Sequence, residues 1–250
     1  MITKSKTMDE FWGHFLQVTF HDGKPERWTV RMKKAEWCIS HLNLKPGSSV
    51  LGLACGDGIV DIWLSRFQCK VTAVDRLGSV LEHARGEDDT KAVQFIQSEL
   101  QKINFPEKSY EGIFIFETLG LLKKEEDYKL LQEAYQWLKP GGRVAVDCPV
   151  APSEKNFWEI DFPHGKVQAA TSFDLATRIH KLKFNFYPTS GEPFKLEDAN
   201  CSNYSSEPGI SRFIYTDQEL REILEKIGFK VETAPHYYEE SYFALIGVKN

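Results

Sequence analysis

The chain has 250 residues, 42% of them hydrophobic and 13% aromatic, which is enough to bury one large core. Its formal net charge is -5 and no cluster of Lys and Arg is visible, so a nucleic-acid substrate, whose phosphates require a basic surface, is not expected. It starts without the apolar segment of a signal peptide and has no run near the roughly 18 apolar residues of a membrane span, so no export or membrane attachment is expected. Its five cysteines include no C-x-x-C pair, so no bound metal is expected. These features predict a cytoplasmic protein.

Helices and short apolar strands are predicted to alternate along the first part of the chain. The expected helices cover 28–42, 60–67, 79–85 and 125–138, and the expected strands cover 49–54, 70–75, 92–97, 112–116 and 143–146. Runs this short and apolar suit strands that are buried on both faces, as in parallel sheets. The alternation predicts an α/β fold with a doubly wound parallel sheet, in which ligands bind beyond the carboxyl ends of the strands.

The alternation stops from Ala151 to about Arg212, where Ser, Pro, Asn and aromatic residues dominate and one strand, 178–186, is expected. Because so long a loop without structure is uncommon, we expect a small insertion of antiparallel strands. Beyond it, Thr216 and Glu219 form a capping box that opens a helix ending at Gly228. The segments 229–232 and 242–248 predict two final strands, joined by a polar turn. We expect one domain over residues 1–250.

A glycine-rich turn, Gly52-Leu53-Ala54-Cys55-Gly56-Asp57-Gly58, follows the first strand of the predicted sheet. Glycines let a backbone approach a ligand closely and present N–H groups at the mouth of a helix, although a plain strand-to-helix turn has the same composition. The next strand ends in Asp75, whose carboxylate can accept hydrogen bonds from two ribose hydroxyls. Asp is also favoured as a helix N-cap, and that role is compatible with ribose binding. Together the two features favour a nucleoside-containing ligand.

Five segments, in chain order, resemble the motifs of the class I S-adenosylmethionine (SAM)-dependent methyltransferases. Val50 to Gly58 resembles V-L-D-L-G-C-G-x-G, and Val74-Asp75-Arg76 resembles the second motif, where the acid holds the ribose. The others are Gln97 to Leu100 with Phe105, resembling G-D-x-x-x-L-P-F; Ser109 to Phe116, resembling the fourth strand; and Leu138 to Gly142, resembling L-K-P-G-G. A nicotinamide-binding fold more typically has G-x-G-x-x-G, whereas Gly58 is followed by Ile59, Val60 and Asp61.

The resemblance implies a seven-stranded, mostly parallel sheet of the Rossmann-like methyltransferase type, with the last strand inserted antiparallel and a small antiparallel insertion after strand five. It implies SAM as the cofactor and S-adenosylhomocysteine as the product. Asp75 is expected on the ribose, and Glu99 and the backbone of Leu100 beside the adenine. The residues that the resemblance places at the cofactor are Gly52, Ala54, Cys55, Gly56, Asp57, Asp75, Arg76, Ser98, Glu99, Leu100 and Phe116.

The first motif departs from the family at two positions. Gly52 replaces the usual acid, and Ala54 replaces the usual central glycine. Loss of the acid removes a polar anchor expected near the methionine moiety of SAM. Three interpretations stay open: these changes are ordinary family drift, Asp57 compensates for the lost acid, or the chain binds SAM weakly.

Methyl transfer from a sulfonium is an in-line displacement, so it depends mainly on positioning the acceptor and excluding water. A general base is needed only for acceptors such as phenols and protonated amines. The candidates for such a base are Glu117, Asp147, His164, His180 and Tyr204, and each of them has an ordinary structural role as its alternative.

The expected acceptor is a small organic molecule, methylated on an O or N atom. The fourth strand is followed by Phe116-Glu117-Thr118-Leu119, which lacks the D/N-P-P-Y/F motif of nucleic-acid adenine methyltransferases, and Cys148 lacks the surroundings of a cytosine-methylating nucleophile. The insertion, residues 151–212, is expected to form a substrate-binding cap. Two alternatives remain: a non-catalytic SAM-binding regulatory or scaffold protein, and an RNA or protein methyltransferase recruited by a partner. The sequence leaves the acceptor's identity and the oligomeric state open.

Overall fold

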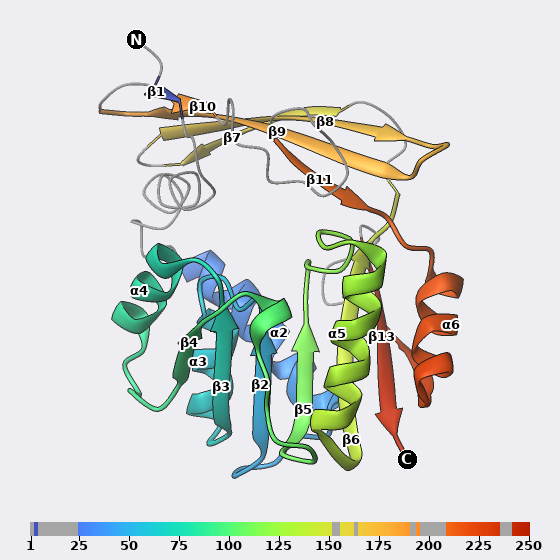
Figure 1. Cartoon of the computed structure of the whole chain (residues 1–250). Helices are drawn as coiled ribbons and strands as arrows, with labels where there is room; N and C mark the ends of the chain where they lie inside the picture. The colour runs from blue at the N-terminus through green and yellow to red at the C-terminus, as the bar shows by residue number, and fades with distance from the viewer. Residues whose placement is uncertain are drawn as a thin grey trace. The chain divides into compact units, whose positions relative to one another are not determined.

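The computed structural model describes residues 3–4, 25–151, 156–162, 165–190, 194–195, 209–235 and 242–250. The chain forms two compact units (Figure 1). We call the first the insertion unit, which comprises Met1–Pro25, Gly120–Lys123 and Ala151–Ile214. We call the second the parallel-sheet unit, which comprises Glu26–Leu119, Lys124–Val150 and Tyr215–Asn250. Each unit is built around its own sheet.

The parallel-sheet unit contains a 7-stranded sheet in the order β12-β13-β6-β5-β2-β3-β4. Its strands are β2 (Ser49–Leu53), β3 (Lys70–Asp75), β4 (Gln94–Gln97), β5 (Tyr110–Ile115), β6 (Leu138–Pro149), β12 (Phe229–Ala234) and β13 (Tyr242–Lys249). Strands β2 to β6 pair in parallel, whereas β13 lies antiparallel between β6 and β12. The predicted doubly wound sheet, with its last strand inserted antiparallel, is confirmed. The polar turn predicted between the last two strands lies outside the described residues.

Helices cover both faces of this sheet, with α2 and α3 behind it and α5 in front of it in Figure 1. The helices are α2 (Pro25–His41), α3 (Ile59–Arg66), α4 (Gly78–Glu87), α5 (Lys124–Trp137) and α6 (Asp217–Ile227), with a short 3-10 helix η1 (Leu100–Lys102). Helix α2 begins earlier than predicted, at Pro25, a residue that suits a first helical turn because the N–H it lacks would have no partner there. Among the described residues, no helix is long and apolar enough to cross a membrane.

The core on one face of the sheet is built from α2, α3 and the strands beneath them. Leu64 of α3, Val50 of β2 and Ala145 of β6 are fully buried there. Each fully buried aliphatic side chain of the size of Val or Leu contributes roughly 1.5–3 kcal/mol. This packing fixes α3 against β2, and therefore fixes the turn that joins them.

The segment Lys139–Gly142, predicted as a turn, is a bulge within β6. Strand β5 pairs with β6 first at Tyr110 and Leu138 and next at Gly112 and Arg143, so the intervening residues of β6 leave the ladder. Gly141 has a φ of +75°, which a glycine adopts without strain. The bulge leaves the carboxyl end of β6 in register with that of β5.

Helix α6 begins with the capping box predicted from Thr216 and Glu219. The Thr216 hydroxyl accepts from the backbone N–H of Glu219 at 3.2 Å, and the Glu219 carboxylate accepts from the backbone N–H of Thr216 at 2.9 Å. Gly228, with a φ of +119°, ends the helix as predicted. The box satisfies two backbone donors that have no partner inside the helix.

We expect Thr216→Ala to lower the free energy of unfolding by about 1 kcal/mol, because the N–H of Glu219 loses its acceptor. Thr216→Ser keeps the hydroxyl and serves as the control. Urea unfolding followed by circular dichroism measures both variants. Equal stability of the alanine and serine variants would contradict a stabilising role for the cap.

The insertion unit contains a 6-stranded sheet in which most neighbours are antiparallel. Its strands are β1 (Thr3–Lys4), β7 (Asn156–Phe162), β8 (Gly165–Asp174), β9 (Ile179–Pro188), β10 (Phe194–Lys195) and β11 (Ile210–Phe213). The predicted antiparallel insertion is therefore confirmed. The sequence did not indicate that β1, from the start of the chain, pairs with β10 in parallel.

Candidate functional site

The glycine-rich turn leads from β2 into α3 with two glycines in the left-handed region. A Cβ at Gly58 would lie 2.8 Å from the ring of Phe95 and 2.9 Å from the Cβ of Ala84, so the protein packs tightly against this glycine. A Cβ at Gly56 would meet no atom within 4 Å. The turn is therefore closed by protein at Gly58 and open at Gly56, which is the side a ligand can approach.

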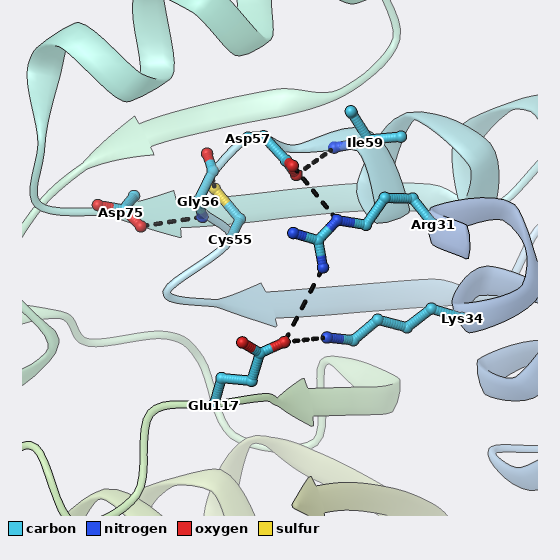
Figure 2. Close-up of polar contacts among 8 residues, drawn as sticks. All are labelled: Arg31, Lys34, Cys55, Gly56, Asp57, Ile59, Asp75 and Glu117. Atoms are coloured by element: carbon cyan, nitrogen blue, oxygen red, sulfur yellow. Dashed lines mark hydrogen bonds and ion pairs between the residues drawn. The ribbon is translucent and has the colours of Figure 1, made fainter. Parts of the chain in front are cut away.

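Asp75, at the end of β3, is bound directly to this turn. One carboxylate oxygen accepts from the backbone N–H of Gly56 at 3.0 Å, and the other accepts from that of Leu77 at 3.0 Å (Figure 2). Burial raises the pKa of Asp75, and the hydrogen bonds from Leu77 and Gly56 oppose that rise. Because each carboxylate oxygen has a further lone pair, the group can still accept hydrogen bonds from two ligand hydroxyls. The N-cap of α4 is Leu77, so Asp75 stands two residues ahead of it.

Two basic residues of α2, which the sequence analysis did not single out, reach the acidic residues beside the turn. Arg31 Nε lies 3.3 Å from a carboxylate oxygen of Asp57, and Lys34 Nζ lies 3.1 Å from one of Glu117. Arg31 Nη1 is also 3.9 Å from Glu117, so the two cations bridge the loops after β2 and β5 (Figure 2). The two residues are three positions apart, which places both on one face of a helix. This spacing could have been used to predict them from the sequence.

Asp57 also accepts from the backbone N–H of Ile59 at 3.2 Å. Its carboxylate is thus held by Arg31 and by the start of α3. Its partners make Asp57 a link between α2 and the turn. Compensation by Asp57 for the lost acid at position 52, one of the interpretations left open by the sequence, stays a prediction.

Gly52 lies in β2 against a carboxyl group of α3. A Cβ at Gly52 would lie 2.2 Å from Oδ1 of Asp61 and 2.6 Å from Cζ of Phe114. Asp61 itself is fully buried. The space in which a side chain at position 52 would begin is therefore filled by the carboxyl of Asp61 and the ring of Phe114. The sequence analysis did not consider Asp61 as a site residue.

Ala54, which stands where the motif usually has a glycine, lies in the left-handed region with a φ of +55°. This conformation costs an L residue roughly 1–2 kcal/mol. Cys55, next to it, has a pKa raised well above the usual range by burial, and the carboxylates of Asp61, Asp75 and Asp57 act in the same direction. Its thiol therefore stays protonated near neutral pH and does not act as a nucleophile.

The residues predicted beside the adenine lie after β4. The backbone N–H of Ser98 donates to the carbonyl oxygen of Asp75 at 2.9 Å, which ties the ends of β3 and β4 together. Glu99 is exposed, and its pKa is lowered by a hydrogen bond and ion pair with Lys102 at 2.8 Å. Leu100 is buried at the start of η1, while Arg76 is exposed and its carbonyl accepts from Gln97. The contacts of these residues with a cofactor stay predictions.

The side chain of Phe116, also predicted at the cofactor, is buried in the core. Its ring stacks on Phe114 with centroids 5.3 Å apart and meets the edge of Trp37 at 5.9 Å. Lys34 Nζ lies 4.5 Å from the ring centroid of Phe116. Any contact of Phe116 with a cofactor therefore has to involve its backbone, and this contact stays a prediction.

Two of the candidate bases, Glu117 and Asp147, lie next to each other at the carboxyl ends of β5 and β6. Asp147 is fully buried and accepts from the backbone N–H of Glu117 at 2.5 Å. Glu117 has a φ of +56°, and its side chain keeps 42% of its surface exposed. A non-glycine residue in the left-handed region is strained, and such strain clusters at functional sites. Asp147 thus positions Glu117, and Glu117 is the carboxylate that a ligand can reach.

The other candidate bases belong to the insertion unit. His180 of β9 pairs across the sheet with Arg212 of β11. Burial, followed by the charge of Arg212, lowers the pKa of His180 to about 4, so its imidazole is neutral at pH 7. Atoms Nε and Nη1 of Arg212 and Nε2 of His180 are buried and have no hydrogen-bond partner among the described residues. His164 and Tyr204 lie outside the described residues.

Known proteins share this fold. A methyltransferase from Clostridium acetobutylicum that depends on S-adenosylmethionine superposes with a TM-score of 0.70, at 15% identity, over 96% of this chain and 98% of that one. The SAM-bound amino pentose methyltransferase CalS10 from Micromonospora echinaspora gives a TM-score of 0.68, at 12% identity, over 91% and 93% of the two chains. At these identities the likeness establishes the fold, which is that of the Rossmann-like methyltransferases.

Sequence comparison finds a methyltransferase domain in the chain. Residues 50–142 match the model of a methyltransferase domain. Phosphoethanolamine N-methyltransferase 3 of Arabidopsis thaliana is 25% identical over 218 residues, which cover 84% of this chain and 39% of that protein. A ubiquinone/menaquinone biosynthesis C-methyltransferase of Escherichia fergusonii is 29% identical over 75% of this chain and 68% of its own. The chain is thus similar to SAM-dependent methyltransferases in fold and in this domain, and it spans about two fifths of the length of the phosphoethanolamine enzyme.

Proposed function

We propose that this chain transfers the methyl group of SAM to an O or N atom of a small organic molecule. The observation that carries the proposal is the open glycine turn at Gly56, hydrogen-bonded to the buried carboxylate of Asp75. When bound, SAM supplies an electrophilic methyl group on its sulfonium. The chain's own residues bind the two reactants, orient them and exclude water, and these effects dominate such displacements.

The residues around the turn fit SAM chemically. Asp75 has free lone pairs for the two ribose hydroxyls, and the open side of Gly56 leaves room for a ligand against the backbone. Arg31 and Lys34 bring positive charge to the same place, which suits the carboxylate of the methionine moiety. Glu117, held by these cations and exposed, is the candidate to accept a proton from an acceptor that needs deprotonation.

The insertion unit is proposed to bind the acceptor, and we propose that this acceptor carries an acidic group. The support comes from Arg212, whose Nε and Nη1 atoms are buried without a hydrogen-bond partner. A buried donor of a charged group that lacks an acceptor destabilises the folded protein. A phosphate or a carboxylate is the acceptor that best fits a guanidinium group. One relative, a phosphoethanolamine N-methyltransferase, is named for a substrate that carries a phosphate. A cytoplasmic location is proposed as well, supported by the free thiols of Cys38, Cys55 and Cys69.

Isothermal titration with SAM and with S-adenosylhomocysteine tests the proposed function first. We expect micromolar binding of both compounds. A panel of acceptors follows, pairing phosphorylated or carboxylated amines and phenols with their uncharged analogues, and methyl transfer is followed by mass spectrometry. Absence of binding by a folded protein that carries no retained cofactor would favour a non-enzymatic role. Methylation of RNA or a protein in the presence of a cell extract, without turnover of any small molecule, would favour a recruited macromolecular methyltransferase.

Arg212→Gln is expected to raise the KM for an acidic acceptor at least tenfold, because the side chain keeps its polarity but loses the charge that binds the anion. The affinity for SAM is expected to stay within twofold of the wild type. Arg66→Gln is the matched control, because Arg66 belongs to the parallel-sheet unit, where its guanidinium pairs with Asp89 and lies over the ring of Trp63. An equal loss of affinity for charged and uncharged acceptors would show that Arg212 has no role in recognising an anion.

A further inference from the structure

The acid that the first motif lacks at position 52 has a counterpart elsewhere in the chain. Oδ1 of Asp61 lies 2.2 Å from the point where a Cβ of residue 52 would stand. Real Cβ atoms do not approach an oxygen so closely, so the carboxyl of Asp61 and a side chain at position 52 exclude each other. Gly52 is therefore not simply a lost acid: it makes room for Asp61 and for the ring of Phe114, whose Cζ would lie 2.6 Å from the same Cβ.

The environment of Asp61 is unusual for a carboxyl group. Asp61 is fully buried in α3, and within the described part of the chain neither of its oxygens has a hydrogen-bond partner from another residue. Burial raises its pKa well above the usual range, and only its own backbone amide and Lys34 oppose this, while Asp57 and Asp75 add to it. A buried polar group without a partner is unfavourable by several kcal/mol. An apolar residue at this position would make the folded protein more stable. Stability therefore does not explain why position 61 carries an acid.

Three carboxylates lie around the glycine turn, and two of them have donors. Asp57 is held by Arg31 and Ile59, and Asp75 is held by Gly56 and Leu77. Only Asp61 among the three has none. The chemistry that this carboxyl can satisfy is therefore a cationic N–H donor supplied by a ligand.

We propose that Asp61 takes over the role of the motif's missing acid and anchors the ammonium group of the cofactor's methionine moiety, directly or through one water. This inference rests on the proposed function, because it takes SAM to be the ligand of the turn. Asp75 then recognises the ribose and Asp61 the amino-acid end. Compared with the motif, the carboxyl group is carried by the helix instead of the strand, and its Oδ1 lies close to where a side chain of residue 52 would begin. The chain would accordingly bind SAM despite its altered first motif.

The test is a swap of the two residues. Asp61→Asn keeps the size of the side chain, and we expect it to weaken binding of SAM and S-adenosylhomocysteine between tenfold and about 100-fold in titration calorimetry, the range of a lost hydrogen bond to a charged group. Asp61→Ala is expected to weaken binding similarly. The double variant Gly52→Asp, Asp61→Ala returns the acid to the strand, and we expect it to recover affinity to within about fivefold of the wild type.

A truncated ligand separates this role from a general effect on the site. 5′-Methylthioadenosine keeps the adenosine and a methylated sulfur but lacks the amino-acid end. We expect Asp61→Asn to leave its affinity unchanged, and we expect thermal unfolding to show a melting temperature at or above that of the wild type. A merely structural Asp61 would change the affinity for all three ligands together, or for none.

The outcomes are distinguishable. If the wild type binds SAM and Asp61→Asn binds it equally well, the role of Asp61 is overturned and the proposed function stands. Failure of the folded wild type to bind SAM or S-adenosylhomocysteine would overturn both. If Gly52→Asp combined with Asp61→Ala fails to fold, the contrast between SAM and 5′-methylthioadenosine in Asp61→Asn decides: equal loss of affinity for both ligands would overturn the inference.

Discussion

Replacing Asp75 with alanine is expected to weaken SAM binding by at least about 100-fold while the chain still folds. Two ribose hydroxyls lose their acceptor, and each hydrogen bond to a charged group contributes roughly 1.5–3 kcal/mol. Affinity for 5′-methylthioadenosine should fall by a similar factor, because this compound keeps the ribose. That shared loss distinguishes Asp75 from Asp61. Titration calorimetry with the three ligands measures the effect.

Two controls accompany this variant. Asp75→Ala also removes the acceptor of the Gly56 and Leu77 backbone donors, so Asp75→Asn, which keeps the volume and one acceptor, is measured beside it. Asp89→Ala removes a carboxylate that forms an exposed ion pair with Arg66 and should leave the affinity unchanged. A folded Asp75→Ala variant with wild-type affinity for SAM would defeat the assignment of Asp75 to the ribose.

Gly120→Ala is expected to damage the insertion unit selectively. A Cβ at Gly120 would lie 1.9 Å from the carbonyl oxygen of Phe213, and Gly120 has a φ of +85°. The backbone N–H of Phe213 also donates to the carbonyl of Gly120 at 2.8 Å, so the two chain segments cannot separate without losing that bond. The conformational cost of roughly 1–2 kcal/mol adds to overpacking of about 1–3 kcal/mol. We expect a loss of about 3 kcal/mol in unfolding free energy.

Gly141→Ala is the matched control, because Gly141 has a similar φ of +75° but a Cβ there would meet no atom within 4 Å. This variant should lose only the conformational cost. We expect Gly120→Ala to abolish turnover of the acceptor while the affinity for SAM stays within a few-fold of the wild type. Urea unfolding and titration calorimetry check the two parts. Similar stability of the two alanine variants would remove the steric argument, and parallel loss of SAM binding would show that the effect is not confined to the insertion unit.

The parallel-sheet unit could be predicted closely from the sequence. Strand β3 has the predicted bounds, Lys70–Asp75, and the helix cap at Thr216 and Glu219 has the predicted hydrogen bonds. Both signals are local, since a buried parallel strand is a short apolar run and a capping box is a spacing of three residues. Local signals of this kind also located the glycine turn and Asp75.

The insertion unit was predicted only in outline. Only one of its strands was predicted individually. The others were not, because their segments mix polar and aromatic residues and the apolar ones are not reliably buried: Phe157 of β7 keeps 65% of its surface exposed. The pairing of Thr3 with Phe194 joins residues from opposite ends of the chain, and no periodicity in either segment encodes it.

The candidate site shows the same division. Asp75 and the turn were predicted from their motifs, whereas Asp61 was noted only as a residue that follows Gly58. Its importance depends on its closeness to Gly52 across the interface of α3 and β2, which only the folded chain brings together. Ala54 has a φ of +55°, a conformation that glycine adopts without strain, and nothing in its segment of sequence predicts that an alanine takes it.

The insertion unit is assembled from three separate stretches of chain, Met1–Pro25, Gly120–Lys123 and Ala151–Ile214. Gly120–Lys123 interrupts the parallel-sheet unit between β5 and α5 and nevertheless contacts β11. Recombination that exchanges only residues 151–214 between relatives would therefore leave a foreign sheet without its matching N-terminal strand and without its fitted Gly120 segment. New acceptor preferences in this protein are accordingly expected to arise by point substitution within the unit or by exchange of all three stretches together. A library of chimeras with single and triple crossovers would separate these routes.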